Sequence, residues 1–184
     1  MIDGYNLRER TAAAAAAALN AIPQEEIDAL TQAILDANRI YVAGWGRAGN
    51  GIRLMSMNCS QTGLKTFVVG DNSTPSIHEG DLLIIGSGSG ETDTMKILAD
   101  QAKEHGAKLA LVTSRPSSYI QDKADITVHI LRTYESEDQH NQPLALSLTF
   151  YQTVVMLNDC IMHYIMEAKG LTFADVRYNH NNLE

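Results

Sequence analysis

The chain has 184 residues, of which 45% are hydrophobic and 20% charged, and its formal net charge at pH 7 is −8. These values predict one soluble globular domain and argue against nucleic acid as a partner, because binding a phosphate backbone requires a basic surface. The chain has no apolar run long enough for a membrane span, no recognisable signal peptide and no CxxC spacing of its two cysteines, so we expect a cytoplasmic protein with reduced thiols.

Two helices are predicted before the first strand. Residues 7–21 are helical by propensity, since residues 12–18 are all alanine. Pro23 opens a second helix, whose apolar side chains repeat at helical spacing towards residue 38. An alanine face allows another helix to approach closely, so we expect the first helix to lie at an interface with a second copy of the chain. The simpler interpretation is a strong helix former.

Short apolar strands then alternate with helices, which predicts a parallel sheet with helices on both faces. The last helix is followed by a polar tail that ends in Asn182-Leu183-Glu184. The predicted strands are residues 39–44, 65–69, 81–86, 108–113 and 125–131, and the predicted helices are residues 48–61, 92–105, 117–123 and 150–169.

Glycine and hydroxyl residues alternate directly after the third predicted strand. The run comprises Ser87, Gly88, Ser89, Gly90 and Thr92, and a helix is predicted to follow it. A helix N-terminus presents unpaired backbone N–H groups to an anion, and glycine lets the backbone approach a ligand closely. The absence of lysine from the loop favours a small phosphorylated metabolite over a nucleoside triphosphate. A plain strand-to-helix turn with one capping hydroxyl is the simpler interpretation.

A second glycine-rich loop follows the first predicted strand. Gly44, Gly46 and Gly49 match the G-x-G-x-x-G spacing of dinucleotide-binding folds, and Asp71 stands near the position of the acid that holds the ribose. A dinucleotide-binding oxidoreductase is therefore one alternative. Two anion-binding loops at the carboxyl ends of neighbouring strands instead favour a single pocket for a sugar phosphate.

In these residues the chain resembles the SIS (sugar isomerase) domain family, and within it the 6-phospho-3-hexuloisomerases. The similarity runs over nearly the whole chain in order. Residues 44–49 resemble G-x-G-R-S-G, 69–75 resemble V-G-[DE]-x-x-[TS]-P, 80–92 resemble G-D-L-x-I-x-x-S-G-S-G-[ER]-T, and 180–184 resemble H-x-N-L-E.

The resemblance implies an α/β fold, namely a flavodoxin-like three-layer αβα sandwich with a five-stranded parallel sheet and interface helices at both ends of the chain. One SIS domain would cover residues 1–184, with N-terminal helices in 1–38, the sheet core in 39–132 and the C-terminal helix and tail in 143–184. It also implies a homotetramer that converts a 3-ketohexose 6-phosphate to fructose 6-phosphate through an enediol, without metal or organic cofactor.

The resemblance also assigns roles to individual residues. Ser87, Ser89 and Thr92 would bind the phosphate, and we expect the backbone at Gly46, Gly88 and Gly90 to contribute to the same site. Arg47 would lie at the mouth of the site. His180 would act as an acid or base, or in ring opening, in the pocket of a neighbouring subunit.

At two positions of the site this chain lacks the polar side chain that the family pattern carries. Tyr151 stands where the family has a glutamate that is the expected base, and Ala48 replaces a serine. Tyrosine, with a reference pKa of about 10, is a weak base at neutral pH. Tyr151 and Glu91 are therefore candidates to replace that base, although Glu91 also fits a first-turn acid of the following helix.

Two functions remain open on this basis, a sugar-phosphate isomerase and a non-catalytic protein that senses a sugar phosphate. Trp45 stands where the family has a small residue, and we expect it either to stack on a sugar ring or to fill part of the site. The six histidines show no metal-ligand spacing such as HExxH, so no metal site is predicted.

Overall fold

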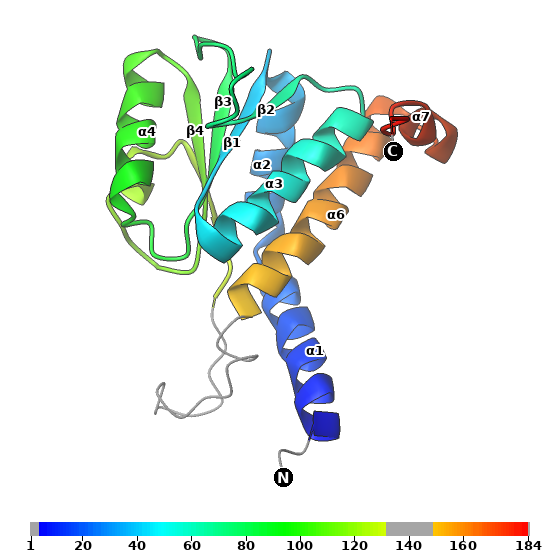
Figure 1. Ribbon diagram of the computed structural model, residues 1–184. Helices are drawn as coiled ribbons and strands as arrows, with labels where there is room; N and C mark the ends of the chain where they lie inside the picture. Colours follow the sequence, from blue (N-terminus) through cyan, green and yellow to red (C-terminus); the bar gives the residue numbers. More distant parts are fainter. Residues whose placement is uncertain (1–3, 132–148, 184) are drawn as a thin grey trace.

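The computed structural model describes residues 4–131 and 149–183, and Figure 1 shows them arranged around one parallel sheet. The helices are α1 (Gly4–Asn20), α2 (Gln24–Asp36), α3 (Gly46–Gln61), α4 (Asp93–Glu104), the 3₁₀ helix η1 (Gln121–Lys123), α6 (Thr149–Lys169) and α7 (Phe173–Tyr178). The strands are β1 (Ile40–Ala43), β2 (Thr66–Val68), β3 (Leu82–Gly86), β4 (Lys108–Thr113) and β5 (Ile126–His129).

The strand order is β2-β1-β3-β4-β5, and every neighbouring pair is parallel. The chain moves from β1 to one side of the sheet to form β2, and then crosses to the other side of β1 to form β3. The loops after β1 and β3 therefore leave the sheet in opposite directions. In open parallel sheets, ligands bind in the crevice at such a switch point.

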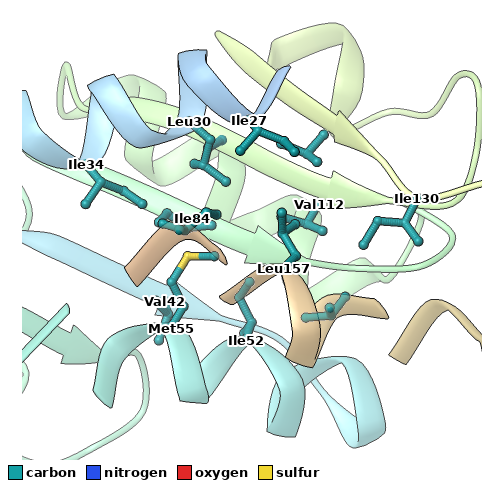
Figure 2. Close-up of a cluster of buried hydrophobic side chains, with 14 of the residues drawn as sticks. Ile27, Leu30, Ile34, Val42, Ile52, Met55, Ile84, Val112, Ile130 and Leu157 are labelled. Carbon is teal, nitrogen blue, oxygen red and sulfur yellow. The ribbon is translucent and has the colours of Figure 1, made fainter. Parts of the chain in front are cut away.

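Helices cover both faces of the sheet and bury a hydrophobic cluster on each (Figure 1). Side chains of a strand alternate between the faces, so Val42 and Ile84 point to the face of α2, α3 and α6, whereas Tyr41 and Ile85 point to the face of α4. Figure 2 shows the larger cluster, in which Leu157 of α6 lies with Val42 and Ile84. The three-layer sandwich expected from the resemblance is confirmed.

The ends of the chain differ in part from the prediction. The alanine face of α1 is used at least partly within the chain, because Ala15 and Ala18 are buried and the Thr153 hydroxyl of α6 donates to the Ala15 carbonyl. The predicted polar tail contains the helix α7, which begins with a capping box between Thr172 and Asp175. In the part of the chain that the structure describes, no helix combines the length and apolarity that crossing a membrane requires.

Candidate functional site

The loops after β1 and β3 meet at the switch point and enclose a cavity of about 350 Å³. The start of α6 closes it from a third side, although α6 is distant in sequence from both loops. The structure thus brings the two predicted glycine loops together, because β1 and β3 are neighbouring parallel strands whose carboxyl ends lie at the same edge of the sheet. The lining residues are Trp45, Gly46, Arg47, Ala48, Gly86, Ser87, Gly88, Ser89, Thr92 and Tyr151.

Hydrogen bonds inside the loop after β3 hold it open towards the cavity. The Ser87 hydroxyl oxygen accepts the Gly90 backbone N–H at 3.1 Å and lies 3.4 Å from the Thr92 hydroxyl. From the end of β4, the Ser114 hydroxyl donates to the Gly88 carbonyl at 2.7 Å, which braces the loop from behind. Thr92 precedes α4 and makes no side-chain cap. Because the Thr92 side chain does not cap α4, the first backbone N–H groups of the helix are available to bind an anion.

Glycine is required where the backbone of the two loops comes closest. A Cβ atom added to Gly44 would lie 2.8 Å from the carbonyl oxygen of Gly86, which is closer than real contacts allow. Gly90 has φ of +65°, and a Cβ there would collide with the Ser118 side chain. Glycine is therefore required at Gly44 by close packing of backbone on backbone, and at Gly90 by its positive φ and by the Ser118 side chain.

Arg47 and Tyr151 line the same cavity as the loop after β3 and contact each other. Arg47 lies in the first turn of α3 and Tyr151 in the first turn of α6, and the guanidinium carbon lies 4.7 Å from the centre of the tyrosine ring. Among the described residues that line the cavity, Arg47 carries the only formal charge. The site can therefore neutralise an anion or a developing oxyanion, and no lining carboxylate competes for the guanidinium.

Trp45 forms a further side of the cavity and is held by a residue of α4. Its indole Nε1 donates to the Thr94 hydroxyl of α4 at 2.7 Å, while 60% of the residue remains exposed. The sequence left open whether Trp45 stacks on a sugar or fills the site. In the structure it does not fill the cavity, and its polar atom is bound to Thr94.

Comparisons with known proteins agree with this geometry. The family model of the SIS domain matches residues 33–158. A Bacillus subtilis protein named 3-hexulose-6-phosphate isomerase is 37% identical over 169 residues, which cover 89% of each chain. The chain belongs to the SIS domain family. A second 3-hexulose-6-phosphate isomerase, from Mycobacterium gastri, is 30% identical over 89% of this chain and 82% of its own.

Solved structures show the same SIS fold. One crystal structure of a hypothetical protein superimposes with a TM-score of 0.88 at 28% identity and covers 97% of this chain and 96% of that one. A Methanococcus jannaschii protein, whose crystal structure infers a molecular function of 3-hexulose-6-phosphate isomerase, has a TM-score of 0.77 at 28% identity over 88% and 87% of the two chains.

Glu91 of this SIS domain is not brought to the cavity, although it follows Gly90 directly. Its carboxylate accepts the Tyr119 backbone N–H at 2.7 Å and forms an ion pair with Lys96 at 2.7 Å. The hydrogen bond from Lys96, followed by that from Tyr119, lowers the pKa of the Glu91 carboxyl below its ordinary value. A carboxylate with a lowered pKa is a weaker base, so this arrangement supports a structural role.

His180 lies at the opposite end of the SIS domain from the cavity. It follows α7, which Figure 1 shows beside the C-terminal ends of α3 and α6. The neighbouring Asn179 donates to the Gln61 carbonyl at the last residue of α3. The cavity begins at the first turn of that helix, whose 16 residues span roughly 24 Å. His180 therefore cannot reach the cavity of its own chain.

The contact that holds Trp45 was not predicted from the sequence. Thr94, which holds Trp45, lies 49 positions away from it, and no sequence spacing indicates such a pair. Asp71, considered for a nucleotide ribose, is not among the residues that line the cavity. Within the described ranges, no group of three or more His, Cys, Asp or Glu residues could hold a metal ion.

Proposed function

We propose that this SIS domain is a sugar-phosphate isomerase that converts 3-hexulose 6-phosphate to fructose 6-phosphate. The observation that carries the proposal is one cavity lined both by the glycine and hydroxyl residues of the loop after β3 and by Arg47. Two relatives at 37% and 30% identity are named for that reaction. A 3-hexulose 6-phosphate carries its phosphate on C6 and its carbonyl on C3, so the phosphate and the reacting carbons need separate groups of the lining.

The phosphate binds at the loop after β3. Ser89 and Thr92 donate hydroxyl hydrogen bonds to it, and the N-terminus of α4 supplies backbone N–H groups and the positive end of the helix dipole. The phosphate takes no part in the reaction. Its binding energy holds the far end of the sugar, so that the carbonyl is oriented against Arg47 and Tyr151 before proton transfer begins.

The reaction moves a carbonyl by one carbon. A base removes the proton from C2 of the 3-ketose, and the electrons shift towards the carbonyl oxygen on C3. An acid donates a proton to that oxygen, which becomes the second hydroxyl of an enediol. The hydroxyl proton on O2 then leaves as the carbonyl forms at C2, and a proton returns to C3. Arg47 stabilises the negative charge that develops on these oxygens, because its guanidinium is positioned in the cavity lining before the reaction begins.

Tyr151 and His180 are the proposed proton-transfer groups. Tyr151 supports this role by its place in the cavity wall, where its ring contacts Arg47. His180 is exposed and far from its own cavity, which supports its acting in the cavity of a second copy. The proposal therefore includes self-association, as a homotetramer. It also includes a cytoplasmic location, which the two free cysteines Cys59 and Cys160 favour.

Proton exchange in deuterium oxide tests the reaction directly. When fructose 6-phosphate is incubated with the enzyme, deuterium should appear at C3 of the sugar, because formation of the 2,3-enediol removes the proton from that carbon. Unphosphorylated fructose is the matched control and should not exchange. Exchange at C1 would instead indicate an aldose–ketose isomerase. Tight binding of the phosphate ester without exchange at either carbon would exclude isomerisation and support the non-catalytic sensor.

A further inference from the structure

The Trp45 indole separates two cavities of different character. On one side lies the 350 Å³ cavity with the phosphate-binding loop and Arg47. On the other lies a cavity of about 280 Å³ between the end of β1, the residues after β2 and the first turns of α4. Trp45 is the residue that the two described linings share. The second cavity is lined by Ala43, Gly44, Trp45, Val69, Gly70, Thr94, Met95, Ile97 and Leu98.

The second cavity is chemically unlike the first. Its side chains are almost all apolar, and none of them carries a charge. Ile97 is a large apolar residue that stays exposed there. A polyhydroxylated sugar gains nothing from such walls, whereas an aryl or alkyl group would be removed from water by them.

One hydrogen bond fixes the position of the indole. Trp45 is mostly exposed, so packing alone holds it weakly, and its Nε1 donates to the Thr94 hydroxyl at 2.7 Å. Thr94 lies in the first turn of α4, two residues after Thr92 of the phosphate-binding loop. The same helix therefore carries part of the anion site and the residue that locks the partition.

We propose that Trp45, locked by Thr94, is a specificity-determining residue that closes the apolar cavity to ligands held on the phosphate-binding loop. The inference rests on the proposed function, because it presumes that a phosphate binds there. With the indole in place, only the polar cavity is available, which suits the phosphate ester of a sugar. With the indole removed or released, the two cavities join, and phosphate esters of apolar alcohols fit.

The test uses Trp45→Ala and Thr94→Val, with Thr94→Ser as the matched control that keeps the acceptor hydroxyl. Calorimetry measures the affinities of fructose 6-phosphate, inorganic phosphate and phenyl phosphate. We expect Trp45→Ala to raise the affinity for phenyl phosphate relative to inorganic phosphate by about tenfold, because the ring becomes buried. Thr94→Val should shift the ratio in the same direction by less, and Thr94→Ser should match the wild type.

A second readout needs no ligand. Trp45 is the one tryptophan of the chain, so acrylamide quenching of its fluorescence reports directly on the lock. Quenching should increase in Thr94→Val and stay at the wild-type level in Thr94→Ser. Equal quenching in the wild type and Thr94→Val would overturn the lock.

The outcomes separate this inference from the proposed function. If the wild type binds fructose 6-phosphate but Trp45→Ala leaves the ratio of phenyl phosphate to phosphate affinity unchanged, the partition is wrong and the function stands. If the wild type binds none of the three ligands, the proposed function fails, and the role of Trp45 in specificity fails with it.

Discussion

The guanidinium carbon of Arg47 lies 4.7 Å from the centre of the Tyr151 ring, so the single cation of the described cavity lining rests on an aromatic face. A cation over a tyrosine ring is stabilised by roughly 0.5–2 kcal/mol, depending on its exposure. The contact joins the first turns of α3 and α6 across the cavity. It also orients the phenol at the position where related isomerases are expected to carry a glutamate.

Tyr151→Phe separates the two roles of this tyrosine. The variant keeps the ring under Arg47 and removes the hydroxyl. If the phenol transfers a proton, kcat should fall by roughly 10²–10⁴-fold while KM changes little. Steady-state kinetics of the isomerisation measure both constants. Tyr151→Glu, which supplies a carboxylate at the same place, should recover activity. A wild-type kcat for Tyr151→Phe would show that another group transfers the proton.

Ser89→Ala and Thr92→Ala should each weaken the binding of fructose 6-phosphate by about 1–2 kcal/mol, because each removes a hydrogen bond to a charged group. Titration calorimetry gives the two dissociation constants. Ser60→Ala, an exposed serine near the far end of α3, is the matched control and should bind as the wild type does. Unchanged affinity in both loop variants would remove these hydroxyls from the site.

Gly90→Ala should destabilise the protein more than an equivalent change elsewhere. Gly90 has φ of +65°, and its added Cβ would also collide with Ser118. Gly170 has nearly the same φ, +63°, with open space around it. Gly170→Ala should therefore lose about 1 kcal/mol from backbone strain, and Gly90→Ala a further 1–3 kcal/mol, roughly, from overpacking. Urea denaturation measures both, and equal losses would argue against the close packing of this loop.

The ion pair of Glu91 should give the stability a defined dependence on pH. Its pKa is lowered in the folded protein by the hydrogen bonds from Lys96 and Tyr119. Its contribution is therefore fully present above the ordinary glutamate pKa of about 4.3 and is lost as the pH falls through the lowered native value.

Melting temperatures of the wild type and Glu91→Gln, measured from about pH 6 to about pH 3, test this dependence. The difference between the two proteins should shrink on acidification, and it should be small throughout because the pair is exposed to solvent. Glu79→Gln, at another exposed glutamate, is the control. A difference that grows as the pH falls would contradict the ion pair.

The order of strands and helices could be predicted because apolar runs, glycine stops and helix caps are local signals. The family could be recognised because its motifs lie in short loops that follow strands. Residues that are close in sequence within such a loop also lie close together in the folded protein. α7 was missed because six residues show no helical period, although the capping box of Thr172 and Asp175 was visible in the sequence.

The side-chain arrangement of the site could not be predicted in the same way. Glu91 lies next to Gly90 in sequence, yet its carboxylate points to Tyr119 and Lys96. Tyr151 enters from a distant helix, and its contact with Arg47 depends on how α6 packs against α3. Such contacts arise from tertiary packing, which neither propensity nor spacing encodes.

The contact between Gly44 and Gly86 has a consequence for how this protein can change. At this point the loops after β1 and β3 meet through main-chain atoms, and a side chain at Gly44 would collide with the Gly86 carbonyl oxygen. The lining outside the phosphate-binding loop, by contrast, includes the side chains of Trp45, Arg47, Ala48 and Tyr151. A related protein can therefore lose or change the reaction through substitutions at these positions while its phosphate-binding loop stays in place. Phosphate binding and catalysis can thus evolve independently of each other.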